Sequence, residues 1–235
     1  LLPQRRVDES LRMLELLQEL DPNNAKIPID EIKNLKLAMD DIERLSSRKI
    51  MDGGLSDADT LRLASAQMIA GQSHLAAQTL RERLQKPGMS PEFALKAGLQ
   101  LQANGLRAEA ADCFNKIPAN HFKGPAFITD DDLRKVYEVY KEVRDVRGVV
   151  NALAAYLPRV PSDWEAWLDY AMICVARGDR EKAKIAVDNA LRHGRHEADQ
   201  TISQWPQLQT LRDPRGAGGR FGGGLSPAKP ARQSR

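Results

Sequence analysis

Residues 164–191 read WEAWLDYAMICVARGDREKAKIAVDNAL, and the apolar spacing of this stretch decides the predicted fold. Two amphipathic segments flank a central Arg-Gly-Asp turn, and each segment carries one apolar face at helical spacing. Small Ala171 in the first segment and Ala183 in the second allow two antiparallel helices to approach closely. Trp167 and Val187 are large enough to fill the remaining space. A helix pair of this size cannot bury its apolar face alone, so we expect it to stack against similar repeats.

The same pattern occurs three more times upstream. Aligned on the turn between the two helices, the repeats start at residues 57, 91, 130 and 164, with spacings of 34, 39 and 34 residues. The matching positions are Leu63, Ala64, Gly71, Ala76 and Leu80 in the first repeat, Ala97, Gly98, Gly105, Ala110 and Phe114 in the second, and Val136, Tyr137, Tyr140, Leu153, Tyr156 and Pro161 in the third.

This register resembles the tetratricopeptide repeat family, whose period is about 34 residues. The resemblance covers residues 57–194 and implies an all-α fold, a right-handed α-solenoid of antiparallel helix pairs. The expected pairs span 57–84, 91–117, 133–157 and 164–191. An unrelated helical bundle is the alternative, although a bundle needs no fixed period.

Each predicted first helix follows a residue that can cap it. These residues are Ser56, Ser90, Thr129 and the pair Ser162-Asp163. Their side-chain oxygens can accept hydrogen bonds from the free backbone N–H groups of the first turn. The three aspartates at 130–132 suit the start of a helix, and this interpretation is preferred over a cation site. The caps support the repeat boundaries independently of the alignment.

Residues 1–24 are expected to form half of a further repeat. Ser10, Leu14 and Leu17 occupy the positions of a tetratricopeptide second helix, and Pro22 should end that helix. The resemblance implies that the matching first helix lies upstream of residue 1. The alternative is an ordinary amphipathic helix followed by a turn.

Residues 25–56 are predicted to hold a long helix over 30–50 and a linker that contains two adjacent glycines. The apolar residues of the helix step by three and four, and they are Ile32, Leu35, Met39, Ile42 and Leu45. The stripe is too short for a coiled coil, so we expect the helix to pack on the repeats.

The segment after the last repeat should cap the array. His193 and the glycine after it are expected to end the last helix of the repeats. Residues 195–212 then form a capping helical segment in which Trp205 and Leu208 cover the last repeat, because a repeat array must shield its final apolar face. Residues 213–235 are Gly-, Pro- and Arg-rich and are predicted to be disordered.

One long loop, residues 118–128, contains the five extra residues of the 39-residue spacing. Its Phe122 and Phe127 either close over the edge of the array or contact a partner, and the structural role is favoured.

The charge and the apolar content of the chain limit which classes of partner are expected. The 235 residues carry a net charge of +3, but residues 212–235 contribute +5, so the remaining 211 residues carry about −2. A nucleic-acid partner is therefore not expected for the folded part, and the alternative of an RNA-associated role rests on the RGG-like tail. No apolar run is long enough for a membrane helix, so a membrane contact would be indirect, through an upstream segment.

The sequence contains no constellation that predicts catalysis. His193 and His196 lack further ligands at a familiar metal spacing. Cys113 and Cys174 are expected to be small buried residues rather than a disulfide or reactive thiols. We therefore predict no catalytic residue, no cofactor and no metal.

In the tetratricopeptide family the first helices line a concave groove. The resemblance places these residues in the groove: Leu61, Arg62, Ser65, Met68, Ile69, Leu95, Lys96, Leu99, Gln102, Arg134, Lys135, Glu138, Lys141, Glu142, Leu168, Asp169, Met172 and Val175. Ser65 and Leu99 stand where carboxylate-binding members carry asparagine, so that specificity is not expected. The groove is apolar at both ends, which favours a helical or extended apolar segment.

Three hypotheses for function follow. The first is a non-enzymatic scaffold that binds a protein or peptide segment, or another subunit of a complex, in the groove. The second is a soluble arm of a larger enzymatic or membrane-anchored protein whose active part lies upstream of residue 1. The third is an RNA-associated protein that acts through the tail. The alternative for the groove is that the chain's own helix 30–50 or another protomer fills it.

Overall fold

Helices and short turns make up the described part of the chain. The computed structural model describes residues 2–21, 28–124 and 127–212, and no β-strand occurs among them, which confirms the all-α expectation. The predicted disorder of residues 213–235 and the expected exit turn at Pro22 lie outside these residues.

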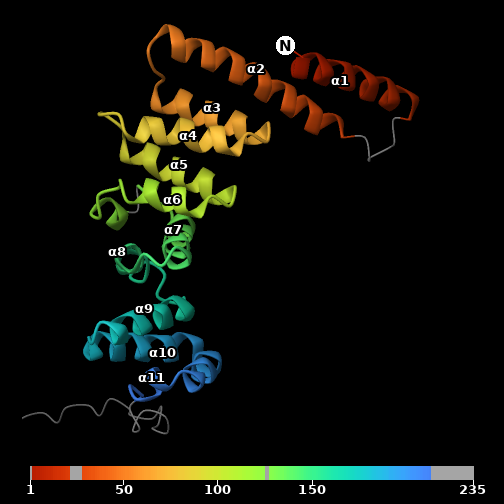
Figure 1. Cartoon of the computed structure of the whole chain (residues 1–235). Helices are drawn as coiled ribbons and strands as arrows, with labels where there is room; N and C mark the ends of the chain where they lie inside the picture. The colour runs from red at the N-terminus through yellow and green to blue at the C-terminus, as the bar shows by residue number, and fades with distance from the viewer. Residues whose placement is uncertain (1, 22–27, 125–126, 213–235) are drawn as a thin grey trace, which may run out of the picture. The chain divides into compact units, whose positions relative to one another are not determined.

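The chain divides into two compact units, Leu1–Arg159 and Val160–Arg235. The first unit contains α1 (Leu2–Leu20), α2 (Ile29–Met51), α3 (Asp57–Ile69), α4 (Ser73–Leu84), α5 (Pro91–Ala103), α6 (Arg107–Phe114), the 3-10 helix η1 (His121–Lys123), α7 (Asp130–Glu142) and α8 (Val146–Tyr156). The second contains α9 (Trp164–Ala176), α10 (Arg180–Gln204) and α11 (Pro206–Gln209), as Figure 1 labels them.

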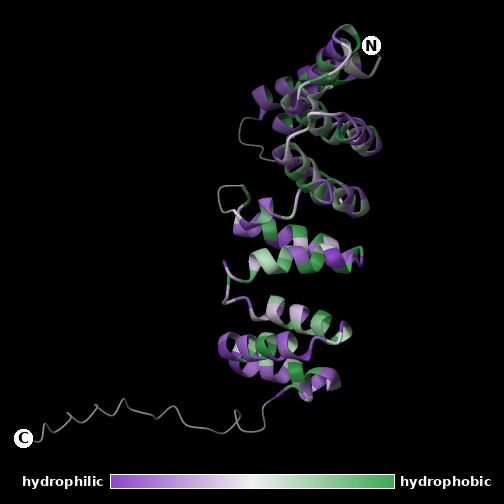
Figure 2. Ribbon diagram, turned by 90° about the vertical axis from the view of Figure 1, so that its left-hand side faces the viewer, coloured by the Kyte–Doolittle hydropathy of each residue, from purple (hydrophilic) through white to green (hydrophobic). Residues whose placement is uncertain are grey.

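Four helix pairs occur where the repeat register predicts them. Helix α3 packs against α4, α5 against α6, α7 against α8 and α9 against α10, each pair joined by a three-residue turn. Apolar and polar residues alternate along these helices, so each one carries both kinds of surface (Figure 2). The second pair ends at Phe114, three residues before the expected boundary, and the third begins at Asp130, three residues earlier than expected.

The turns within the pairs share one backbone conformation. Gly71, Gly105 and Gly178 have φ angles of 73°, 76° and 77°, and Arg144 at the matching position of the third pair has φ 60°. In each turn the amide after this residue donates to a carbonyl five residues earlier, as from Asp179 to Cys174 at 2.9 Å. This closure is the glycine-type helix end, so Arg144 adopts a left-handed conformation that disfavours side chains with a Cβ.

The predicted caps are confirmed. Ser56, Ser90, Thr129 and Asp163 each accept a hydrogen bond at 3.1 Å from the backbone amide three residues ahead. The caps recur with the spacing of the repeats, because each one starts the first helix of a pair.

Neighbouring elements pack in sequence within the first unit. Helix α1 packs on α2, α2 on α3, α3 on α5, and α5 on α7. Within two of the pairs, an ionic contact joins the end of the pair to its first residue. Arg83 contacts Asp57 at 2.7 Å, and Arg159, which follows α8, contacts Asp130 at 2.6 Å. In the long loop Phe122 is buried, which agrees with its expected structural role.

The second unit has a closely packed core. Ala171, Ala183 and Val187 are fully buried between α9 and α10. The expected helix end at residues 193–194 agrees with a break in α10: the backbone of Arg195 is non-helical, with φ 45°, and a second helical segment then runs to Gln204. Gly194 lies against Trp164, since a Cβ there would come within 2.4 Å of the Trp164 Cγ.

The capping segment closes this core. Leu208 and Leu211 are buried, Trp205 packs against the same core, and α11 contacts both α9 and α10. The two cysteines are buried and free, which agrees with their predicted structural role.

Candidate binding surface

An apolar hollow of about 610 Å³ lies between α2 and α3 in the first unit. Its apolar lining is Ile32, Leu35, Leu37, Ala38, Ala66 and Ile69, and its polar lining is Glu31, Asn34, Asp41, Arg62 and Ser65. Leu37 is 64% exposed and Ile69 is 55% exposed. Large apolar side chains of two neighbouring helices are therefore presented to solvent around one concavity.

Small side chains create this hollow. Ala38 on α2 and Ala66 on α3 are buried where the helices meet, and Ser65 is half-buried beside them. None of the three reaches far enough to fill the space between the helices. The hollow therefore follows from residue size as well as from the helix arrangement.

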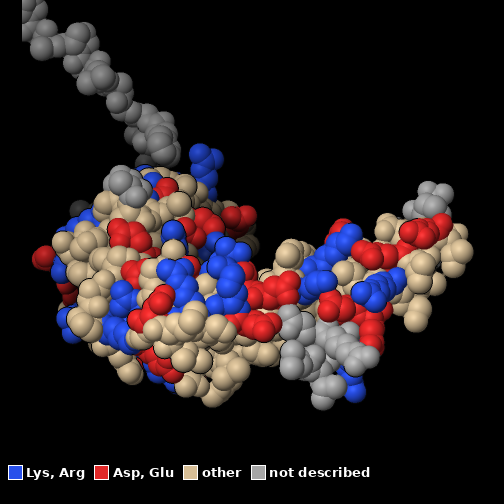
Figure 3. Space-filling view, turned by 90° about the horizontal axis from the view of Figure 1, so that it is seen from above, with Lys and Arg blue, Asp and Glu red and all other residues tan. Residues whose placement is uncertain are grey.

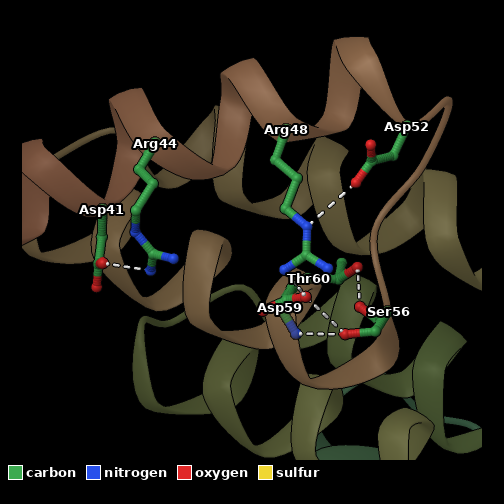
Figure 4. Close-up of polar contacts among 7 residues, drawn as sticks. All are labelled: Asp41, Arg44, Arg48, Asp52, Ser56, Asp59 and Thr60. Carbon is green, nitrogen blue, oxygen red and sulfur yellow. Dashed lines mark hydrogen bonds and ion pairs between the residues drawn. The ribbon is translucent and has the colours of Figure 1, made fainter.

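Ionic contacts fix the C-terminal half of α2 over α3 and α4. Arg48 Nη1 lies 3.0 Å from Asp59 Oδ2, and Lys49 Nζ lies 2.6 Å from Glu82 Oε2. Figure 4 shows Arg48 pointing from α2 toward Asp59, which itself accepts a hydrogen bond from the Ser56 hydroxyl at 2.9 Å. The wall that α2 forms is thus anchored at one end by contacts outside the hollow.

A further ion pair lies at the hollow itself. Arg62 Nε donates to Asp41 Oδ2 at 2.7 Å, and Arg44 Nη2 donates to Asp41 Oδ1 at 2.9 Å. The hydrogen bond from Arg62, followed by that from Arg44, holds the pKa of Asp41 below its ordinary value. A charged Asp41 therefore holds α2 and α3 together at the edge of the hollow.

These contacts bear on the predicted groove of the first repeat. Arg62 and Ser65 lie in the hollow, and Leu61 and Met68 are half-buried on the same helix. Helix α2 packs on α3 and pairs with Arg62, so the chain's own helix covers part of the expected groove face, as the alternative proposed.

The second repeat contributes less than expected. Leu95 is buried in the helix packing, so its assignment to an open groove is corrected. Lys96 is exposed, and Leu99 and Gln102 are half-buried. The family resemblance assigned position 95 to the groove, but on α5 this position faces the core.

The expected groove residues of α7 are engaged in local ion pairs. Lys135 Nζ lies 2.6 Å from Asp131 Oδ2, and this hydrogen bond raises the pKa of Lys135. Arg134 Nε lies 3.1 Å from Glu138 Oε1, and Lys141 is exposed. Both pairs lie within one helix, where such contacts contribute only a few tenths of a kcal/mol.

In the second unit, Leu168 is 2% exposed and belongs to the core, so its groove assignment is also corrected. Asp169 is half-buried, and Met172 is half-buried against the same core. The second unit therefore retains less of the expected apolar groove surface than the sequence suggested.

The sequence stripe on α2 includes Ile32 and Leu35 of the hollow but not Leu37. The spacing of Ile32, Leu35 and Leu45 predicts a stripe that packs on the repeats, and Leu45 is fully buried. Leu37 lies outside that stripe. A leucine off the stripe, next to the alanine at position 38, was the signal that the sequence offered.

Acidic and basic side chains are interspersed on the face that Figure 3 shows, which includes no broad field of one sign. Within the described ranges, no group of three or more His, Cys, Asp or Glu side chains lies close enough together to hold a metal ion. Among the helices that the structure describes, none is both long and apolar enough to cross a membrane. No protein-family model and no curated protein sequence matches this chain.

Proposed function

We propose that this chain is a non-enzymatic interaction scaffold that binds a helical or extended apolar segment of another protein in the hollow between α2 and α3. The observation that carries the proposal is the concavity of about 610 Å³ with Leu37 and Ile69 exposed around it. An apolar side chain inserted between these residues would remove their surface from water.

The composition of the hollow favours a protein segment over a small ligand. Small-molecule sites enclose most of their ligand, and a few polar groups of the protein point toward it. Here Asp41 and Arg62 already satisfy one another, and the apolar rim is open. An amphipathic helix can lay its apolar face into such a groove and keep its polar face in water.

We propose further that the helix pairs form a tetratricopeptide-like right-handed α-solenoid. The support comes from the 34, 39 and 34 residue spacings of the sequence, together with a side-chain cap and a left-handed turn position that recur at those spacings. Repeats of this kind mostly provide extended binding surfaces rather than catalytic sites.

The test starts from a displayed library of random peptides selected on the immobilised 235-residue chain. We expect selected peptides to share apolar residues at helical or alternating spacing. Their affinities are then measured for wild type and for Leu37→Glu and Leu99→Glu, with thermal melts of all three. A charge buried against the peptide costs several kcal/mol, so Leu37→Glu should lower the affinity at least tenfold without changing the melt.

Leu99→Glu separates the α2–α3 hollow from the wider groove that the sequence predicted. Loss of binding with Leu99→Glu alone would place the site on α5 and refute the proposal. Unchanged binding by both folded variants would refute a binding role for either surface.

A further inference from the structure

Helix α1 is apolar on two adjoining faces. One face carries Val7, Leu11 and Leu14, which are half-buried, and α1 packs against α2. The adjoining face carries an exposed apolar row at helical spacing, consisting of Met13, Leu16, Leu17 and Leu20. Leu20 is 82% exposed. A helix with two apolar faces is suited to lie between two neighbours, and one of them, α2, is present.

The charges of α1 decide against a membrane surface as the second neighbour. Over its full length, Leu2–Leu20, the helix carries three arginines against four acidic residues, which gives a charge of −1. Helices that bind at anionic membrane surfaces are rich in Lys and Arg on their polar face. The second neighbour should therefore be a protein surface.

The exposed row is complementary to itself. When two copies of α1 lie antiparallel around a two-fold axis between Leu16 and Leu17, each Leu16 lies opposite the Leu17 of the other copy. Met13 then lies opposite Leu20 in the same register. A two-fold interface requires such reciprocity, since each contact occurs twice.

The flanking charges agree with this register. Arg12 and Glu19 are seven residues apart and lie on the same side of the exposed row. In the antiparallel arrangement, Arg12 of one copy comes beside Glu19 of the other, with an offset of about 3 Å along the helix axis, and this pair forms twice. Opposite charges across an interface fix its register.

From this reciprocity we propose that the exposed face of α1 docks against the same face of a second copy of this chain, in an antiparallel homodimer held by leucine contacts and two Arg12–Glu19 pairs. The surface is separate from the hollow between α2 and α3. One helix per copy makes a small interface, so the dimer should be weak and dependent on concentration.

The first experiment is sedimentation velocity of the 235-residue chain over a range of protein concentrations. We expect wild type to shift from monomer to dimer as concentration rises. Leu16→Glu should weaken self-association at least tenfold, because two charges would meet in the apolar row. Leu75→Glu is the matched control, since Leu75 is an exposed leucine on α4 and its variant should dimerise like wild type.

The second experiment uses charge exchange between copies. Arg12→Glu and Glu19→Arg should each weaken self-association severalfold, because each places like charges opposite one another. A mixture of these two variants restores both opposite-charge pairs, so it should form a heterodimer about as stable as the wild-type dimer. A purely local effect on α1 would not be corrected by mixing.

Three results would overturn the proposal. Wild type that stays monomeric at the highest concentrations would show that the face does not self-associate. A dimer that survives Leu16→Glu would use another surface. A mixture of the two charge variants that associates no better than either alone would contradict the antiparallel register.

Discussion

The α9–α10 pair and the α2–α3 pair both place alanines where two helices meet, but they use the resulting space differently. Between α9 and α10, Ala171 and Ala183 are fully buried and large neighbours close the contact. Between α2 and α3, Ala38 and Ala66 are buried beside a hollow of about 610 Å³. Small residues therefore allow close packing only where neighbouring large residues fill the remaining volume.

The largest expected effect follows from adding volume to the closed pair. Ala183→Trp should lower the free energy of unfolding by about 1–3 kcal/mol or more, because a fully buried contact has no room for an indole ring. Thermal and urea unfolding followed by circular dichroism measure the change. A stability equal to wild type would show that the α9–α10 contact is loosely packed.

The matched substitution in the open pair should behave differently. Ser65→Trp places the same ring at the hollow, where the half-buried serine leaves space. We expect a much smaller change in unfolding free energy than for Ala183→Trp, together with loss of peptide binding because the ring occupies the hollow. Destabilisation as large as that of Ala183→Trp would contradict the distinction between the pairs.

The next effect concerns the turn that closes each pair. The α9–α10 turn has Gly178 at φ 77°, whereas the α7–α8 turn has Arg144 at φ 60°. Since the left-handed conformation costs a residue with a Cβ about 1 kcal/mol or more, Arg144→Gly should stabilise the chain by up to about 1 kcal/mol. Gly178→Ala provides the reciprocal test and should destabilise the chain. If Arg144→Gly destabilised the chain, the arginine side chain would contribute more to stability than its left-handed backbone conformation costs.

The smallest effect is ionic and depends on pH. Asp41→Asn removes the carboxylate that pairs with Arg62 and should cost no more than about 1 kcal/mol at neutral pH, because the arginine is largely exposed. The lowered pKa of Asp41 in the folded state means that its contribution is present above the unfolded pKa of about 3.9. It is lost as pH falls through the folded pKa, so wild type and variant should converge in acid. A difference that grows as pH falls would contradict this assignment of the pKa shift.

The repeat pattern predicted the helix pairs because their determinants are local. The caps Ser56 and Thr129 and the turn glycines act within a few residues of their own position, and the apolar spacing sets the buried face. The break in α10 at Arg195 lies one residue after the predicted helix end at residues 193–194, whereas the contact of Gly194 with Trp164 depends on the fold and could not be predicted from local sequence.

The candidate site was less predictable for a similar reason. Arg62 and Ser65 were assigned from the repeat register and do line the hollow. Leu95 and Leu168 were assigned by the same register and are buried, since the exact rotation of each helix depends on its neighbours. The wall that α2 provides lies outside the repeats, so no repeat position could indicate Leu37.

Hydrogen exchange with and without a selected peptide tests the central claim most directly. The account predicts that saturating peptide slows amide exchange in residues 31–41 of α2 and 61–69 of α3, the segments that line the hollow, and leaves α9 and α10 unchanged. Slower exchange confined to α9 and α10, with α2 and α3 unaffected, would contradict binding at the open pair.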